Sequence, residues 1–396
     1  MALSIVVEAA RILGAKRLVP IASAHIDGCL YHGVSGTLFC ERLVALGART
    51  SVPTTTNVGA LNLLNPKQAR LTGRARRMAF RLMIAHEEMG CRPSWTCAPY
   101  QAGARPTLGQ QVAWGESNAV AFCNSVLGAR TNRYGDFLDI ACAIAGRAPY
   151  YGLHIPENRH ATLVLDVSGL PERWQKDAAF FPVLGALIGL LAGARVAAIT
   201  GLGPSADDDC LKALCAAAAA TGAVGLIHLV GITPEALTLA AALGGHTCAP
   251  RIDVSADMMI AARATLSHLE TGPIDAVALG SPHFSAQECR ELLAVARGGR
   301  FQVPVYVCLG RQTLEVLRAE GTEAALADLG VQFVADTCVV VTPILPAASG
   351  VLMTNSAKFA HYAPGNTGYV PVFGSLADCV ASAQAGRITR VGAGWS

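Results

Sequence analysis

Downstream of residue 160, short runs of β-branched residues alternate with alanine-rich stretches of helical length, and this alternation constrains the fold more than any other feature. The runs that we predict as strands cover residues 162–166, 196–200, 224–229, 276–279, 303–308, 332–335 and 339–342. Predicted helices lie between most of them, at residues 207–220, 234–242, 255–270, 285–296 and 312–319. Strands that alternate with helices form α/β layers whose sheets are largely parallel. We therefore predict an α/β protein built from several such layers.

The first 160 residues contain the same kinds of element in a less regular order. Helices are predicted at residues 3–14, 38–46, 66–89 and 137–145, and short strands at residues 17–21 and 50–52. A chain of 396 residues exceeds the length at which a single core usually stops growing. We expect three α/β domains, which cover residues 1–150, 151–250 and 251–396.

Composition and charge argue against several classes of partner. The formal net charge is +3 and the basic residues are scattered, which gives no support to binding of nucleic acid or of a membrane surface. The longest apolar stretch, residues 180–197, contains three glycines, a proline and Arg195, and it is short for a membrane span. Glu8 interrupts the amino-terminal helix and no small-residue cleavage site follows, so a signal peptide is not expected.

The sequence contains 13 cysteines, and their spacing is unlike that of a small disulfide-bonded secreted protein. The odd count also argues against complete pairing. We expect reduced thiols in a cytoplasmic protein, with a few of them available to a metal.

One stretch, residues 89–133, collects an unusual number of polar groups between apolar runs. It contains three thiols, the carboxylate of Glu116, several amides and hydroxyls, and Arg130. Burying such groups without partners costs free energy, so an ordinary core segment has little reason to carry them. This stretch is therefore the first candidate for a functional site.

Every polar cluster of this kind follows a predicted strand or opens a predicted helix. The clusters are residues 23–33, 53–57, 96–100, 280–283, 308–311, 336–338 and 354–358. In parallel α/β sheets, ligands bind beyond the carboxyl ends of the strands. We therefore expect the clusters to contribute to one shared site.

Three cysteines stand at predicted strand ends in different regions of the chain: Cys97, Cys308 and Cys338. None belongs to a CxxC pair, so the spacings of zinc fingers and ferredoxins are absent. Each one alone could be a small buried hydrophobic residue. Three thiolates on one iron would instead leave a coordination position for a substrate oxygen. Both interpretations remain open at this point.

Several charged residues could take part in chemistry. Arg130 follows a predicted helix end, where it could cap backbone carbonyls or clamp a substrate carboxylate with two hydrogen bonds. Glu116, His25, Asp27 and His32 could serve as acid, base or supporting residue, although a loop histidine is often only structural.

The segment from Thr354 to Gly365 contains a possible anion site. Asn355 and Ser356 stand at a predicted helix N-terminus, with Lys358 close behind, and such a terminus binds anions. Ser356 could equally be an N-cap. We assign substrate binding to these residues and to others in the polar clusters: Ser23, Asn57, Asn118, Arg130, Asn355 and Ser356. We assign catalytic roles to His25, Glu116, Arg130 and Lys358.

Eight motifs in this order resemble the aconitase X family, the large catalytic portion of hydro-lyases related to aconitase: PTTTN, TCAPY, WGESNAV, NSVLGARTNR, YYGLH, ALGSPH, DTCVVVTP and MTNSAKFAHYAPG. The resemblance covers residues 3–374. It implies an aconitase-like α/β fold of similar-sized domains around a central cleft with an iron–sulfur cluster, for which we favour 2Fe–2S, or a mononuclear iron. It also implies a separate small swivelling domain, either a second subunit or fused, that completes the active site.

By motif, the resemblance implies that Cys97, Cys308 and Cys338 are the iron ligands, with Cys123 a less suitable substitute. Ser281 and Phe284 stand where some relatives carry cysteines, and Asn62 stands where an aspartate is frequent. Ser281 and Phe284 therefore cannot be ligands here, and the asparagine at position 62 argues against an acid role there.

Two activities are attached to the family: dehydration of cis-3-hydroxy-L-proline to Δ1-pyrroline-2-carboxylate, and dehydration of mevalonate 5-phosphate. The segments AHIDGCLYHG and PTTTNVGALNL look closer to the hydroxyproline branch. By analogy with aconitase, a serine of the small domain would be the base, so this chain alone should be nearly inactive. A non-catalytic binding subunit with structural thiols is the alternative of another class.

Overall fold

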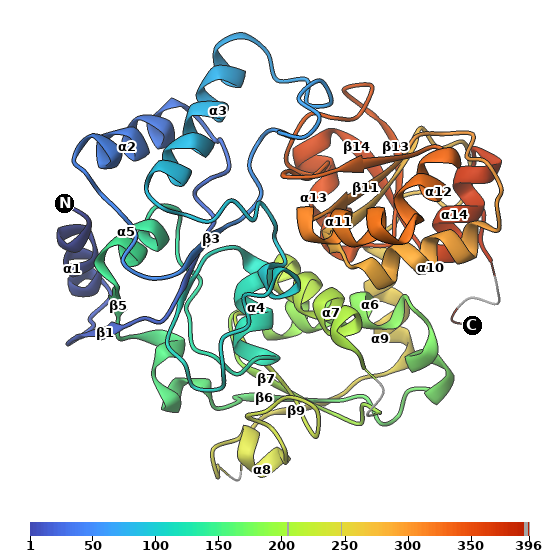
Figure 1. The fold of residues 1–396 in the computed structure, drawn as a ribbon. Coiled ribbons are helices and arrows are strands. Elements are labelled where there is room, and N and C mark those ends of the chain that lie inside the picture. Colours follow the sequence, from blue (N-terminus) through green and yellow to red (C-terminus); the bar gives the residue numbers. More distant parts are fainter. Residues whose placement is uncertain (204–205, 247, 392–394, 396) are drawn as a thin grey trace.

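The computed structural model describes residues 1–203, 206–246, 248–391 and 395. The chain forms three α/β sectors that follow one another in sequence, from blue through green and yellow to red in Figure 1. Each sector has its own sheet with parallel strands, and an antiparallel pair joins β1 (Leu18–Pro20) to β5 (Arg147–Pro149). The predicted α/β class with largely parallel sheets is confirmed.

The first sector contains a small sheet of strand order β3-β2-β4. Its strands are β2 (Ala24–Ile26), β3 (Thr54–Thr56) and β4 (Ala113–Trp114), and both neighbours run parallel to β2. Its helices are α1 (Ala2–Ile12), α2 (Val34–Ala45), α3 (Gly73–Glu88), α4 (Ser117–Ser125) and α5 (Leu138–Ala145).

The prediction of a strand at residues 50–52 was wrong. The strand that pairs with β2 is the threonine run that follows, β3. β-branched threonines suit strands, and here backbone groups satisfy their hydroxyls. Thr54 Oγ1 donates to the carbonyl of Val52 at 2.8 Å, and Thr56 Oγ1 accepts from the amide of Trp95 at 3.1 Å. The polar cluster at residues 53–57 therefore contains a buried strand, β3.

The middle sector has a sheet of order β8-β7-β6-β9. Its strands are β6 (Leu163–Asp166), β7 (Ala197–Thr200), β8 (Ile227–Leu229) and β9 (Arg251–Asp253), and its helices are α6 (Phe180–Ala192), α7 (Asp208–Thr221), α8 (Leu239–Ala242) and α9 (Ala256–Ala264). The apolar stretch forms α6 and leads into β7. Gly185 lets α6 approach α7, since a Cβ there would lie 2.3 Å from the carbonyl oxygen of Leu214. Within the described residues, no helix is both long and apolar enough to cross a bilayer.

The third sector has a parallel sheet of order β12-β11-β10-β13-β14. Its strands are β10 (Ala276–Phe284), β11 (Val305–Leu309), β12 (Val331–Val334), β13 (Gly350–Thr354) and β14 (Tyr369–Phe373). Its helices are α10 (Ala286–Ala296), α11 (Arg311–Glu320), α12 (Thr322–Asp328), α13 (Ala357–Thr367) and α14 (Leu376–Ala385).

The strand predicted at residues 339–342 was wrong. The amides of Val341 and Thr342 both donate to the carbonyl of Cys338, at 3.1 and 3.0 Å, so the segment closes into a turn. Val339 and Val340 are buried in a hydrophobic cluster below the turn. Apolar residues are buried in this cluster as they would be in a sheet. The periodicity of apolar residues therefore could not distinguish a buried turn from a strand.

The three sectors meet around α7, which packs against α4, α6 and α13 near the middle of Figure 1. The carboxyl ends of β2, β3 and β4 lie on one side of this meeting point, and the loops after β10, β12 and β13 lie on the other. The middle sheet extends to β9, which pairs with β6. The boundaries at residues 150 and 250 stay a prediction.

Candidate active site

A cavity of about 390 Å³ lies between the first and third sectors. It is lined by Asp27, Leu30, His32, Asn57, Val58, Cys97, Glu116, Ser117, Arg133, Tyr134, Ser281, Cys338, Val340, Val341, Lys358, Tyr362 and Asn366. Asp27, Asn57 and Glu116 come just after β2, β3 and β4, as expected for the ligand-binding edge of a parallel sheet. Among the residues that the sequence analysis assigned to the site, Asn57, Cys97, Glu116, Cys338 and Lys358 line this cavity.

The thiols of Cys97 and Cys338 line the cavity, and Cys308, which is not among the lining residues, is their neighbour. All three are buried, and the Cys308 thiol forms a hydrogen bond with Cys338, which lowers the Cys338 pKa. Burial, together with the nearby Cys338 and Cys97 sulfurs, raises the Cys308 pKa well above its usual value. Backbone amides support the sulfurs, because His283 N donates to Cys97 Sγ at 3.3 Å and Val339 N donates to Cys308 Sγ at 3.4 Å.

The close approach at Cys308 requires a glycine on the neighbouring strand. Gly280 has φ +89°, and a Cβ there would lie 2.1 Å from the carbonyl oxygen of Cys308. Any larger residue would push β10 away from β11 at this point.

The donor set of the three cysteines fits an iron–sulfur group in its chemistry, because thiolates are the usual ligands of such clusters. Among the residues that the structure describes, however, no three His, Cys, Asp or Glu side chains are placed to hold a single metal ion. The three thiols therefore match an iron–sulfur group in their donor chemistry.

A buried ion pair between the first and third sectors forms the next part of the site. Glu116 Oε1 accepts a hydrogen bond from Lys358 Nζ, and Glu116 Oε2 accepts from the amide of Ala119 at 2.6 Å. Burial raises the pKa of Glu116, but Lys358 and the helix amides outweigh it, so the net pKa lies below the usual range. Burial lowers the pKa of Lys358, but Glu116 more than reverses this. Both groups therefore stay charged at the cavity wall.

The backbone is strained next to these groups. Glu116 has φ 70°, Asp336 has φ 64° and Trp95 has φ 41°, although none of them is glycine. Positive φ values cost free energy in such residues and concentrate at functional sites. Each of the three stands within two residues of Ser117, Cys338 or Cys97, which line the cavity.

Asp336 holds the loop of Cys338 in place. Its carboxylate accepts from Arg311 Nε at 2.6 Å and Nη2 at 2.8 Å, and from the amide of Leu63 at 3.1 Å. Its carbonyl accepts from the amide of Gly59 at 2.8 Å. The loop is therefore tied both to its own sector and to the first one.

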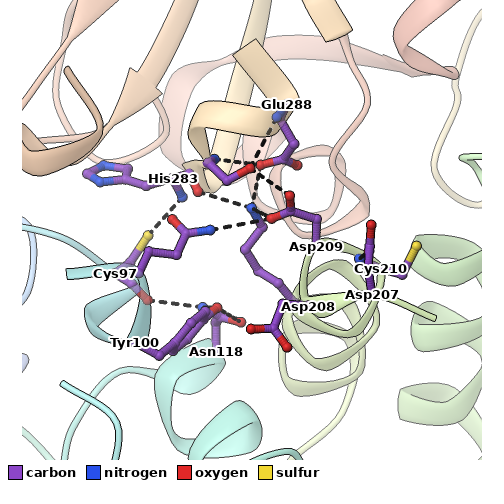
Figure 2. Close-up of polar contacts among 12 residues, drawn as sticks. Cys97, Tyr100, Asn118, Asp207, Asp208, Asp209, Cys210, His283 and Glu288 are labelled. Atoms are coloured by element: carbon purple, nitrogen blue, oxygen red, sulfur yellow. Dashed lines mark hydrogen bonds and ion pairs between the residues drawn. The ribbon is translucent and has the colours of Figure 1, made fainter. Parts of the chain in front are cut away.

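Behind Cys97 lies a buried polar network that the sequence analysis missed (Figure 2). Lys212 of α7 donates to Asp209 at 2.7 Å, to Glu288 of the third sector, and to the carbonyl of His283 at 3.3 Å. Ser285 Oγ donates to Asp209 at 2.6 Å. Because the amide of His283 contacts Cys97, the network supports that sulfur from the middle and third sectors. A lone lysine in an alanine-rich helix, three residues after a run of three aspartates, was the available signal.

Two residues assigned to substrate binding form hydrogen bonds with the segments that surround the site. Asn118 Nδ2 donates to the carbonyl of Cys97 at 3.0 Å and contacts Tyr100, below the Cys97 loop in Figure 2. Ser356 is the N-cap of α13, accepts from the amide of Phe359 at 3.0 Å, and donates to the carbonyl of Ser281. Neither is among the residues that line the main cavity.

Four other assigned residues also lie away from the lining. His25 is inside β2 and not beyond its end, its Nδ1 lies 2.8 Å from Thr55 Oγ1, and burial lowers its pKa to about 4. Ser23 lines a separate cavity at the amino ends of the same strands. Arg130 forms a backbone bridge to Gln111, and its Nε is buried without a hydrogen-bond partner.

Asn355 lines a smaller cavity beside Lys212. Its Oδ1 is buried without a hydrogen-bond partner. Arg133, three residues beyond Arg130, is the arginine that reaches the main cavity. The local sequence could not distinguish these two arginines, because the folded path of the loop after α4 decides which of them lines the cavity.

Comparison with known proteins identifies the family. Family models match residues 1–157 as "Aconitase X first domain", residues 161–264 as "Aconitase X second domain" and residues 274–385 as "Aconitase X third domain". A crystal structure of Thermococcus kodakaraensis aconitase X (holo-form) superposes with a TM-score of 0.86 at 31% identity, covering 96% of this chain and 94% of that one.

Named relatives fall into two groups. Cis-3-hydroxy-L-proline dehydratases from Pseudomonas aeruginosa and Hypocrea jecorina are 42% and 41% identical over 392 residues, covering 98% and 96% of this chain. The match spans only 67% and 65% of their own length. The phosphomevalonate dehydratase large subunit of Methanothermobacter thermautotrophicus is 37% identical over 374 residues, covering 94% of this chain and 91% of that one. With all three domain models matched in order, the chain belongs to the aconitase X family.

Proposed function

We propose that this chain is the large portion of a hydro-lyase that removes water from cis-3-hydroxy-L-proline. The observation that carries the proposal is that Cys97, Cys338, Glu116 and Lys358, which come from different sectors, line one cavity. The names of the relatives at 42% and 41% identity support this substrate. The phosphomevalonate relatives are more distant, at 37% identity and below.

The chain's own residues would bind the substrate carboxylate and stabilise the charge that develops on it. Loss of the C2 proton places negative charge on the carboxylate, and a cation fixed in a buried site stabilises that charge. Lys358 is such a cation, since Glu116 holds its ammonium in place. Arg133 also lines the cavity, but it is exposed and its Nη1 donates to the carbonyl of Gly222 at 3.2 Å. One well-placed donor contributes about 3–4 kcal/mol to such a transition state.

Cys97, Cys308 and Cys338 would hold the iron–sulfur group, for which we propose 2Fe–2S, and that group supplies a Lewis acid for departure of the C3 hydroxyl. The substrate loses the proton from C2 and hydroxide from C3, which leave as water. The enamine that remains then tautomerises to Δ1-pyrroline-2-carboxylate. We further propose that the base is a serine of a small swivelling portion, as in the analogy with aconitase.

A smaller partner is supported by the relatives. The matched region is 67% and 65% of the length of the two hydroxyproline dehydratases, so each contains a further portion. The archaeal relative is named a large subunit. We infer that this chain works with a small aconitase X subunit or domain. The cysteines other than Cys248 are free thiols, which supports a reducing, cytoplasmic location.

Mevalonate 5-phosphate is the second candidate substrate, on the strength of the archaeal relatives. A phosphomonoester requires several cations, and phosphate sites are commonly built from arginines and helix N-termini. The cavity offers Arg133 and Lys358, and Lys358 is already paired with Glu116. This charge balance favours hydroxyproline.

The first prediction concerns assembly. The chain combined with the small portion of a hydroxyproline relative should dehydrate cis-3-hydroxy-L-proline, followed as Δ1-pyrroline-2-carboxylate, and should leave mevalonate 5-phosphate unchanged. The chain alone should be nearly inactive, because the base is missing. Turnover of phosphomevalonate by the assembly would show that phosphomevalonate, and not hydroxyproline, is the substrate. Full activity of the isolated chain would show that the base does not come from the partner.

The second prediction concerns the cofactor. Iron and sulfide in anaerobically purified protein should fall to background in Cys338→Ala, because one thiolate ligand is lost. Cys379→Ala is the matched control, since Cys379 is also buried but lies in α14 of the third sector. Wild-type protein without iron would support a non-catalytic binding subunit whose thiols are structural.

A further inference from the structure

One side of the cavity carries uncompensated negative charge. Asp27 lines the cavity, and its Oδ1 accepts a hydrogen bond from Asn57 Nδ2, which is neutral. Its backbone amide donates to Asp139 Oδ2 at 2.6 Å, which fixes its position. Within the part of the chain that the structure describes, Asp27 has no ion-pair partner, whereas Glu116 is paired with Lys358. We call Asp27, Glu116, Asp136 and Asp139 the acidic side of the cavity.

The groups that face Asp27 come from every element packed around it. They are Cys29 and His32 on its own loop, Asn57 after β3, Glu116 at the start of α4, Arg133 and Asp136 in the loop before α5, Asp139 in α5, and Lys358 in α13. Burial keeps the Cys29 thiol neutral by raising its pKa. The carboxylates on this side therefore outnumber the cations, and one of the two cations is already paired.

The acid–base behaviour of Asp27 agrees with this charge balance. Burial, then the charges of Glu116 and Asp136, raise the pKa of Asp27 to about 7. A carboxylate with such a pKa lacks a counter-charge. A cation delivered by a ligand would supply one and would displace the proton.

Asp27 and Lys358 are close to the same carboxylate, since both interact electrostatically with Glu116. The cavity thus presents a carboxyl group without an ion-pair partner and a fixed ammonium, and both interact with Glu116. An α-amino acid carries its ammonium and its carboxylate on adjacent atoms, which matches this arrangement. A ligand with a carboxylate and a phosphate, but no amine, does not match it.

We propose that Asp27 binds the ring ammonium of a 3-hydroxy amino acid whose carboxylate lies at Lys358, and that Asp27 thereby selects amino acids over hydroxy acids without an amine. This inference rests on the proposed function for the site, and it adds the residue that recognises the substrate class. The acidic side also repels a phosphate, so the same residues would reject phosphomevalonate.

Two probes isolate the ammonium. L-Proline and tetrahydrofuran-2-carboxylate have the same ring and carboxylate, but the second carries oxygen in place of the ring nitrogen. Neither has a 3-hydroxyl group, so neither can be dehydrated. Their dissociation constants, measured by calorimetry on the assembled, iron-loaded protein, report recognition without turnover.

The wild-type protein should bind L-proline about 30-fold or more tightly than tetrahydrofuran-2-carboxylate, as expected for a buried charge pair. Asp27→Asn should remove this preference and should raise the KM for hydroxyproline more than it lowers kcat. Binding of L-proline near pH 6.5 should release protons from the wild type and none from the variant, because the ammonium lowers the pKa of Asp27. Asp328→Asn, an exposed change of the same chemistry at the end of α12, should behave as wild type.

The outcomes separate this inference from the proposed function. An Asp27-dependent preference for L-proline without hydroxyproline turnover would sustain the inference and overturn the reaction. Turnover together with an unchanged preference in Asp27→Asn would overturn the inference and sustain the reaction. If Asp27→Asn does not fold, Asp136→Asn removes an exposed charge of the acidic side and should weaken L-proline binding severalfold at low salt. Unchanged binding in Asp136→Asn would count against the inference.

Discussion

Replacing Lys358 by methionine is expected to lower kcat/KM for hydroxyproline roughly 100- to 1,000-fold, because the transition state loses the cation that stabilises its carboxylate. Methionine keeps the length and apolar stem of lysine, so the packing of α13 is preserved. The loss should fall mainly on kcat, since the charge on the carboxylate grows as the C2 proton leaves. Steady-state kinetics of the assembled enzyme measure both parameters.

The partner residue provides the discriminating comparison. Glu116→Gln removes the carboxylate that positions the ammonium of Lys358 but keeps the ammonium itself in the cavity. This substitution should therefore reduce kcat less than Lys358→Met does. Lys176→Met is the control, because Lys176 lies in an exposed 3-10 helix and its side chain is 78% exposed. If Lys358→Met retains more than a tenth of the wild-type kcat, Lys358 does not stabilise the transition state, and the proposed mechanism fails.

Replacing Lys212 by methionine is expected to lower the free energy of unfolding by about 3 kcal/mol, because it leaves two partly buried carboxylates without their counter-charge. Lys212 is fully buried between Asp209 and Glu288. Even with Lys212 present, burial raises the pKa of Glu288 to about 7. Urea unfolding followed by circular dichroism gives the difference in free energy.

The pH dependence of this loss identifies its cause. In the folded variant the pKa of Glu288 should rise further above that of the unfolded chain. A group with a raised pKa in the folded state contributes stability at low pH that is lost as pH rises through that pKa. The loss in Lys212→Met should therefore be greater at pH 8 than at pH 6. A loss of the same size at both values, or one matched by Lys176→Met, would show that the buried charges are not responsible.

The two substitutions also test different links between structure and function. Lys358 contacts the cavity, so its loss should change kinetics with modest effects on stability. Lys212 contacts the cavity wall only through His283 and Cys97, so its loss should change stability and cofactor retention first. Iron content of both variants, measured beside the unfolding curves, separates the two effects.

Local sequence patterns determined the α/β class and the residues that follow strands. The period of apolar residues depends on near neighbours in the chain, so β6, β7, β11 and α10 were found close to their observed positions. A polar residue that is buried after a strand without a partner costs free energy, unless it contributes to the ligand-binding edge of the sheet. For this reason the sequence alone pointed to five residues that line the cavity: Asn57, Cys97, Glu116, Cys338 and Lys358.

Only the tertiary structure decided which of these side chains meet, and what surrounds them. The turn at residues 339–342 has the composition of a strand and is buried like one, but it finds no partner strand. Arg130 forms a backbone bridge to Gln111, whereas Arg133 lines the cavity. Lys212 acquires its role from residues that lie up to 76 positions away. The acidic side around Asp27 arises in the same way, because charges interact through space, whereas a sequence pattern records only order along the chain.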